Sequence, residues 1–223
     1  RTEQFELNLL DDTHVLSLEV FTYKADLKVR GNDKLTWYWF SGTKRQNKSI
    51  LANFGDTSIT TADALQSQKW ENGVWKVEYN TTLGSNVFVE ARGGNFFERG
   101  TYDGEGTNPR YRDTGTNRVY GNAGFSYSNS QRPQGSGALN YFKDGWAGSH
   151  NFKIGGEVMR SLTWGTSGVF NNLETILNNG TPTQVRIYEA PLDETERRGN
   201  TGWGVYVQDT WRLNSRLTLN LGI

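Results

Sequence analysis

The last stretch of the chain, residues 201–223, alternates apolar and polar side chains with a period of two. Its odd positions between 203 and 213 are apolar except for Asp209, and the alternation resumes after Asn214 and Ser215. A period of two places successive side chains on opposite faces of a strand, whereas a helix needs a period near 3.6. The stretch is therefore predicted to form two antiparallel strands joined by a very short turn.

Two tryptophans mark the ends of the apolar face of this hairpin. Trp203 and Trp211 are eight residues apart. At roughly 3.3 Å per residue and a tilt of about 40°, they are separated by roughly 20 Å along a barrel axis. Outer-membrane barrels carry an apolar band about 25 Å tall between two aromatic girdles. The hairpin is predicted to cross a bilayer, with Asp209 beside the turn, where a charge costs little or a bulge turns it inward.

These residues also carry a family resemblance. Residues 204–223 resemble the strand-turn-strand signature of TonB-dependent outer-membrane receptors, and residues 31–46 and 144–158 resemble hairpins of their Oar-like branch. The resemblance covers patches along most of the chain. It implies a 22-stranded barrel that takes up a scarce ligand, captured by long loops, with a plug domain moved by the TonB complex.

The family's plug domain, TonB box and terminal aromatic strand have no counterpart in this sequence. The sequence begins with Arg1 and stops at Ile223, inside an alternating strand. We therefore expect residues 1–223 to be a fragment of a receptor barrel without its plug.

Composition excludes some classes of protein and leaves others open. The 24 basic and 24 acidic residues cancel, so no nucleic-acid partner is indicated, and the absence of cysteine excludes disulfides and thiolate metal sites. No apolar run is long enough for a membrane helix. The 29 aromatic residues, 8 Trp, 10 Tyr and 11 Phe, suit girdled strands around a polar lumen, and they equally suit a lectin-like sandwich.

Hairpins and long polar stretches alternate along the chain. Residues 1–21 fit no single period and are expected to be loop plus a short strand, and residues 62–68 are weakly helical. Short turns on one side and long loops on the other are typical of outer-membrane barrels, with the turns in the periplasm. The expected hairpins are 22–45, 73–97, 134–164 and 201–223, with turns at 31–33, 82–86, 144–149 and 214–215 and extracellular loops at 46–72, 98–133 and 165–200.

The predicted fold is all-β, a partial wall of about eight strands from a transmembrane antiparallel β-barrel. The alternative is a secreted carbohydrate-binding β-sandwich or β-propeller module that stacks exposed tryptophans on sugars. A soluble sandwich has one wet face and comparable loops at both ends. The asymmetry of the connections favours the barrel and the outer membrane of a Gram-negative bacterium.

Candidate binding residues cluster in the second long loop. Arg110, Tyr111 and Arg112 offer forked hydrogen bonds and stacking to an anionic or aromatic ligand. The alternative is a solubilising loop that touches lipopolysaccharide phosphates. The tryptophans near strand ends are predicted to be membrane-girdle anchors rather than a sugar-stacking set. They are Trp37, Trp39, Trp75, Trp164, Trp203 and Trp211.

Metal and catalytic sites are not expected. His14 and His150 are far apart without an acidic pair at ligand spacing, and residues 103–108 offer an incomplete calcium pattern that an ordinary solvated loop explains better. The sequence lacks a Ser-His-Asp set, a nucleophile elbow and a phosphate-binding loop, so we expect no enzyme and no cofactor. The expected partners are outer-membrane lipid and lipopolysaccharide, an unidentified extracellular ligand, and the TonB complex through a plug domain.

Overall fold

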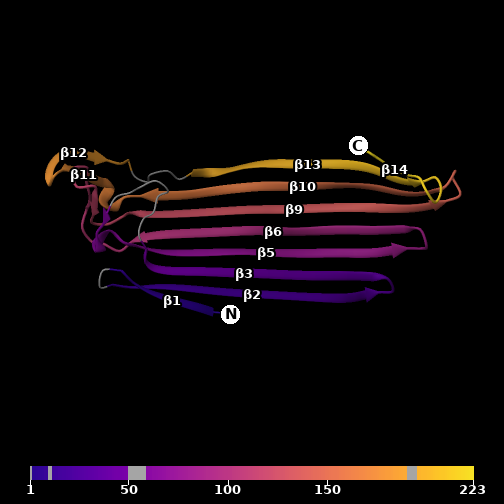
Figure 1. Ribbon diagram of the computed structural model, residues 1–223, viewed down its shortest axis with the longest axis horizontal. Coiled ribbons are helices and arrows are strands. Elements are labelled where there is room, and N and C mark those ends of the chain that lie inside the picture. The colour runs from indigo at the N-terminus through magenta and orange to yellow at the C-terminus, as the bar shows by residue number, and fades with distance from the viewer. Residues whose placement is uncertain (1, 10–11, 50–58, 190–194) are drawn as a thin grey trace.

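One large antiparallel sheet dominates the molecule (Figure 1). The computed structural model describes residues 2–9, 12–49, 59–189 and 195–223. Within them the sheet has nine strands in the order β1-β2-β3-β5-β6-β9-β10-β13-β14, and each strand pairs antiparallel with its neighbours. We call this sheet the wall. Its strands are β1 (Thr2–Leu9), β2 (Asp12–Arg30), β3 (Asp33–Ser49), β5 (Gln66–Leu83), β6 (Val87–Gly104), β9 (Phe125–Asp144), β10 (Ser149–Gly168), β13 (Thr195–Arg212) and β14 (Thr218–Gly222).

The wall strands are longer than the sequence pattern predicted. β9 and β10 have 20 residues each, about twice the 9–11 that a strand needs to cross a bilayer. The expected loops 46–72, 98–133 and 165–200 therefore begin and end inside strands. The boundaries were misplaced because the backbone ladder continues where both faces are polar, and alternation then gives no signal.

The N-terminal region is also strand rather than loop. β1 pairs with β2 from Thr2 opposite Glu19 to Leu9 opposite Asp12. The expectation of loop plus a short strand for residues 1–21 was wrong, and the wall has nine strands instead of about eight. A single period is missing here because leucines and valines fall on both parities, as at Val15 and Leu16.

A second, smaller sheet sits at the end of the wall opposite the hairpin turns (Figure 1). We call it the cap. It has the order β12-β11-β7-β8-β4, and it draws strands from all three of the long connections. Two of its pairings, β11 with β7 and β4 with β8, are parallel. Its strands are β4 (Ile59–Thr60), β7 (Arg110–Asp113), β8 (Arg118–Tyr120), β11 (Leu173–Asn178) and β12 (Thr181–Ile187).

Helical structure is minor. The weakly helical stretch 62–68 contains a three-residue 3-10 turn at Ala62–Ala64, and β5 then begins at Gln66. A second 3-10 turn covers Phe170–Asn172. In the described part of the chain, no helix has the length and apolar character needed to cross a membrane.

The wall has one apolar and one polar face. Its register is uninterrupted over long stretches, so odd positions of β2, β3, β5, β6, β9, β13 and β14 share a face with even positions of β10. This apolar face carries Val205, Trp203 and Ile154, while the polar face carries Glu90 and Lys153.

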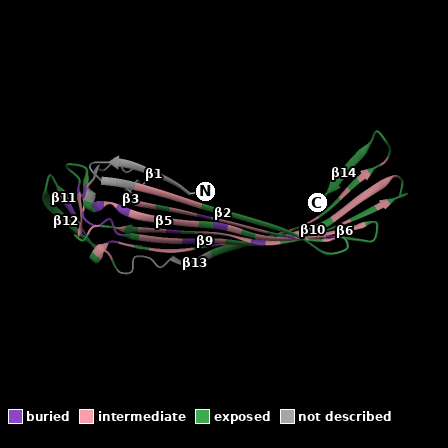
Figure 2. Ribbon diagram, turned by 90° about the horizontal axis from the view of Figure 1, so that it is seen from below, coloured by how far each residue is buried: buried purple, intermediate pink, exposed green. Residues whose placement is uncertain are grey.

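The apolar face is uncovered. Trp203 is 77 % exposed and Val205 75 %, and Figure 2 shows the wall as a single curved layer. Sandwich sheets instead pack face to face about 10 Å apart. Among the described residues no second sheet covers this face, so the alternative of a soluble β-sandwich does not describe the fold. Few apolar side chains are buried among the described residues, and several of these are small: Ala64, Val119, Ala123, Ala138, Leu162, Val169 and Ile176.

Candidate functional site

Charged side chains form a connected row across the polar face of the wall. Lys76 on β5 lies 2.9 Å from Glu78, whose carboxylate is 3.7 Å from Arg92 on β6. Arg92 donates to Glu90 at 3.0 Å, and Lys153 on β10 donates to the same carboxylate at 2.7 Å. Successive opposite charges therefore span the strands from β5 to β10. Such a face suits water and polar solutes rather than lipid.

A hollow of about 400 Å³ opens on this polar face, lined by residues of β5, β6, β9 and β10. Gly94 lies in its floor, where a Cβ would come within 2.6 Å of the Trp75 carbonyl oxygen. Glycine is required there because the neighbouring strand approaches too closely for a side chain. The charged members of the lining, which carry both signs, are Lys76, Glu78, Arg92, Arg132 and Glu157.

Glu174 is the centre of the cap. It lies on β11, is only 2 % exposed, and accepts a hydrogen bond from the Tyr188 hydroxyl at 2.8 Å. Its carboxylate oxygens lie 3.1 Å from Arg110 Nε, 3.5 Å from Arg112 Nε and 3.4 Å from Arg186 Nη1. Burial raises the pKa of the Glu174 carboxyl, but the Tyr188 bond and the three guanidinium groups outweigh burial and hold it below its usual value.

Asp113, at the end of β7, ties two turns of the cap together. Its buried carboxylate accepts backbone N–H groups of Gly115 at 2.9 Å and Thr116 at 3.1 Å in its own turn. It also accepts those of Asn179 at 2.9 Å and Gly180 at 2.8 Å in the turn between β11 and β12. Burial raises the pKa of the Asp113 carboxyl. The four backbone donors lower this pKa by more than burial raises it, so the net shift is downward.

A buried turn joins the cap to the wall. Asn122 donates from Nδ2 to the carbonyl oxygens of Gly104 at 2.9 Å and Gly106 at 2.6 Å. The backbone N–H of Gly121, whose φ is +73°, donates to the Asp63 carboxylate at 2.9 Å. The first and second long connections are thereby fixed to each other. The cap is a folded unit, and its polar contacts replace a large apolar core.

The structure separates the three residues that the sequence singled out as a ligand site. Arg110 and Arg112 alternate with Tyr111 along β7, so the two guanidinium groups share the face that carries Glu174 and Tyr111 lies on the other face. Arg110 also donates to the Ala123 carbonyl at 2.8 Å. The structure brings the two arginines together but places Tyr111 on the opposite face of the strand. Their role in binding a ligand stays a prediction.

All six of the predicted girdle tryptophans lie on the apolar face of the wall, and four of them lie at neighbouring levels. Trp39 on β3 is directly opposite Trp75 on β5, and Trp37 is two residues away on the same face. Trp203 lies on β13, opposite Val158 of β10. These positions share one face with the apolar side chains, as girdle residues must.

The other two tryptophans lie at different levels. Trp211, beside the hairpin turns, stacks on His150 with ring centroids 5.2 Å apart and donates from Nε1 to the Ala147 carbonyl at 3.0 Å. Trp164 lies six residues beyond Val158, the partner of Trp203, so it is well up β10 toward the cap and not at the level of Trp203.

Asp209 stays on the apolar face without a bulge, because its partner Phe152 lies within an uninterrupted register. His150 Nδ1 lies 2.7 Å from the Asp209 carboxylate, and its ring stacks on Phe152 at 5.1 Å. The histidine thus partners the charge that breaks the apolar pattern. The side chain of His14, the other candidate, lies outside the described residues.

The possible calcium stretch at 103–108 is engaged by the protein. Glu105 accepts hydrogen bonds from the Ser67 hydroxyl and the Lys48 backbone N–H. In the part of the chain that the structure describes, no group of three or more acidic, histidine or cysteine side chains is arranged to hold a metal ion.

Residues 11–223 match the family model of the outer membrane beta barrel domain. The chain belongs to this family. Its fold is similar to the crystal structure of the outer membrane transporter YddB from Escherichia coli, with a TM-score of 0.69 and 13 % sequence identity. That likeness covers 95 % of this chain and 27 % of the YddB chain, so the residues here span about a quarter of the transporter's length. No curated protein sequence matches the chain.

Membership of this family gives the two faces of the wall their meaning. In outer-membrane barrels the apolar face of the strands meets lipid and the polar face lines the lumen. The apolar face here carries the exposed Trp203 and Val205, and the polar face carries the charged row. The barrel domain lies in the outer membrane. The cap stands at one end of the wall, and the hairpin turns stand at the other.

Proposed function

We propose that this barrel domain is part of a TonB-dependent outer-membrane transporter that takes up a ligand from outside the cell. The observation that carries the proposal is the charged lumenal row with its hollow of about 400 Å³, on a wall whose long connections fold into a cap. A protein that only anchors in the membrane has no need of such a lumen. The likeness to an outer membrane transporter supports the same function.

In this proposal the cap lies outside the cell and the hairpin turns lie in the periplasm. Outer-membrane barrels place long connections outside and short turns inside. The nine-stranded wall is then an arc of a 22-stranded barrel, since the large outer-membrane transporters have that number. The lipid-facing partner is outer-membrane lipid, including lipopolysaccharide. TonB dependence rests on the resemblance of residues 204–223 to receptor hairpins.

The cap favours an anionic ligand. Arg110, Arg112 and Arg186 gather around the single carboxylate of Glu174, so the cluster has a surplus of positive charge. The Arg186 side chain is half exposed and offers donors to a ligand carboxylate or phosphate. The role of the protein is capture and passage. We propose no covalent chemistry and no cofactor.

The experiment is a depletion assay with three strains of the bacterium that carries the full-length gene: wild type, a deletion of this gene, and a deletion of TonB. Mass spectrometry follows the small molecules that disappear from a defined medium. We expect at least one compound, anionic at neutral pH, to be depleted by the wild type and spared by both deletions.

The outcome against the proposal is equally clear. Depletion that needs the gene but continues without TonB would contradict TonB dependence. Indistinguishable media from the wild type and the gene deletion, in medium that contains the full range of nutrients of the natural habitat, would contradict uptake.

A further inference from the structure

The lipid-facing side of β2, β3, β5 and β6 changes character abruptly along the strands. One cross-strand row consists of Tyr23, Trp39, Trp75 and Asn95, all in direct register. Four residues further toward the cap, the row on the same face is mostly charged: Glu19, Thr43, Glu71 and Arg99. The next row is rich in hydrogen-bond donors: Ser17, Arg45, Lys69 and Thr101.

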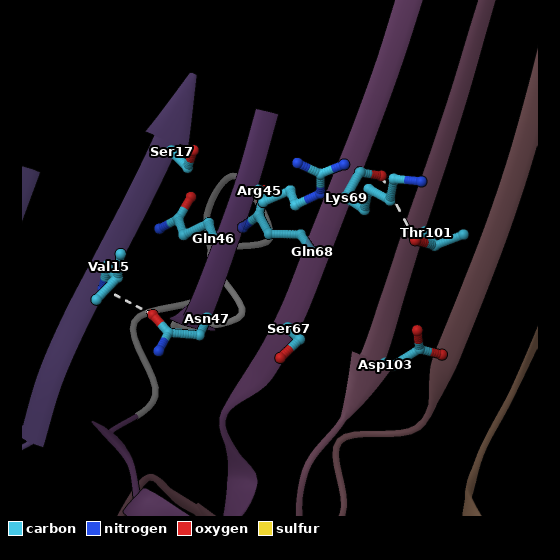
Figure 3. A pocket seen from close by; sticks show the side chains of 10 residues that line it. All are labelled: Val15, Ser17, Arg45, Gln46, Asn47, Ser67, Gln68, Lys69, Thr101 and Asp103. Atoms are coloured by element: carbon cyan, nitrogen blue, oxygen red, sulfur yellow. Dashed lines mark hydrogen bonds between the residues drawn. The ribbon is translucent and has the colours of Figure 1, made fainter. Parts of the chain in front are cut away.

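This last row lines a hollow of about 450 Å³, shown in Figure 3. Asn47, Ser67 and Asp103 also line it, and the paired Ser67 and Asp103 lie on the lipid side of the strands. Figure 3 shows Arg45, Lys69 and Thr101 in one row across three strands. We call this the donor hollow. Gln46 and Gln68 also line it from the opposite face, but Ser17, Arg45, Lys69 and Thr101 share the face of Trp39 and Trp75, so this row of donors points away from the lumen.

The distance of the donor hollow from the aromatic row limits which membrane-attached ligands can reach it. Arg45 is six residues beyond Trp39, and Lys69 is equally far from Trp75, which is roughly 15 Å along the barrel axis at about 3.3 Å per residue and about 40° tilt. The headgroups of an ordinary phospholipid extend only about 5–8 Å beyond the hydrocarbon core. A ligand at this height that is still attached to the membrane must be a glycolipid with several sugars.

Two cations, Arg45 and Lys69, and one carboxylate, Asp103, line the hollow, and the two cations are the part that suits an anion. Arg45 and Lys69 are directly opposite each other on neighbouring strands, an arrangement that repels unless something lies between or beside them. Each also has an acidic partner one row nearer the membrane, Glu19 at 3.2 Å and Glu71 at 2.7 Å. All four side chains are one-third to one-half exposed, so these pairs are weak and exchangeable.

We propose that the donor hollow binds a phosphorylated sugar of the lipopolysaccharide in the outer leaflet. A phosphate between Arg45 and Lys69 accepts charge-assisted hydrogen bonds from both and relieves their repulsion. The hydroxyls of Ser17 and Thr101 face the sugar, and the lipid chains lie along the aromatic row below. The inference rests on the proposed placement of the cap outside the cell.

The test uses the full-length protein purified in detergent and fluorescently labelled lipopolysaccharide, with binding followed by anisotropy. Arg45→Gln combined with Lys69→Gln is expected to weaken binding about tenfold or more, because two charged donors are lost. The matched control is Lys24→Gln combined with Lys34→Gln, which removes two cations from the lumenal face of β2 and β3 near their hairpin turn, and it is expected to bind as the wild type does. Heat-modifiable migration on gels shows that each variant is folded.

Competition identifies the source of the phosphate. Unlabelled lipopolysaccharide should displace the probe, whereas dephosphorylated lipopolysaccharide and phosphatidylglycerol should not. Equal binding by the wild type and the Arg45/Lys69 variant, or equal loss in the lumenal control, would overturn the proposal. Binding is measured without TonB or uptake, so its failure leaves the proposed transport function standing, and failure of transport leaves the binding result standing.

Discussion

The wall and the cap are both β-sheets, yet they are held together in opposite ways. The wall pairs neighbouring hairpins in chain order, and its apolar face is left open, as at Trp203 and Val205. The cap joins short strands from distant parts of the chain and buries two carboxylates, Asp113 and Glu174. In our account the membrane supplies the second layer that the wall lacks. The cap, which lies outside the membrane in our account, must satisfy its polar groups by itself.

The largest effect that separates the two regions should come from a charge on the lipid side of the wall. In the full-length protein, Val205→Arg or Leu219→Arg should each lower stability by about 2–4 kcal/mol, because an arginine near the midplane of the bilayer is poorly solvated. Gln208→Arg and Asn220→Arg, on the lumenal face, should cost much less. Urea unfolding of the protein refolded in lipid vesicles measures the difference. If the lumenal pair proves more costly, the two faces have been exchanged.

The next largest effect belongs to the cap. Glu174→Gln removes the carboxylate shared by three arginines. We expect the cap to lose about 2–3 kcal/mol, less than for a fully buried pair, because the side chains of Arg112 and Arg186 are one-third and one-half exposed. Hydrogen exchange across 110–120 and 173–187 should increase while exchange in the wall is unchanged. Glu71→Gln, which breaks an exposed pair on the wall, is the matched control. Equal exchange in both variants would contradict a central role for Glu174.

The pH dependence of the cap should be smaller and of known sign. The pKa of Glu174 is lowered in the folded cap, so its contribution to stability is present above the pKa of the unfolded state, 4.5, and is lost as the pH falls below that value toward the folded pKa. The lowered pKa of Asp113 acts in the same direction. Protection of 173–178 against hydrogen exchange, corrected for intrinsic rates, should be constant from pH 7 to about 5 and decline below about 4.5. Glu174→Gln should flatten much of this decline. Protection that rises on acidification would contradict the assignment.

The smallest expected effect is on the lumenal row of the wall. Lys76→Gln breaks a pair with Glu78 in which the lysine is nearly half exposed, and it should cost about 0–1 kcal/mol in the same urea assay. High salt should reduce the effect further. A loss as large as that of Glu174→Gln would show that the lumenal row is a structural core, contrary to the comparison drawn here.

Alternation predicted the wall where one face is apolar and failed where both faces are polar. The facing of Val205 and Leu219 follows directly from their parity, and the structure confirms an all-β antiparallel sheet. The outer half of β9, by contrast, alternates Phe125, Tyr127 and Asn129 with serines for only six residues, and residues 131–133 then end the period. Such strands form because their neighbours already fix the ladder.

The cap was beyond the reach of a sequence argument. Arg110 and Arg112 were noticed as cations, but their partner Glu174 lies in another long connection, about sixty residues later, and nothing local marks it. The same holds for Asp113, whose carboxylate accepts a hydrogen bond from the backbone N–H of Asn179 in the third long connection. One signal was available. If residues 110–112 form a strand, side chains alternate between its faces, so Tyr111 points away from the face that Arg110 and Arg112 share.

The most direct test of the account is the side on which the wall meets lipid. Single cysteines are placed at Val77 and Lys76 on β5, and at Val207 and Gln208 on β13, in the full-length protein folded in lipid vesicles. A membrane-impermeant thiol reagent and a lipid-soluble spin quencher then report water and lipid contact at each site. The account predicts lipid contact at positions 77 and 207 and water contact at positions 76 and 208. Water contact at all four positions would contradict a wall that lies in the membrane.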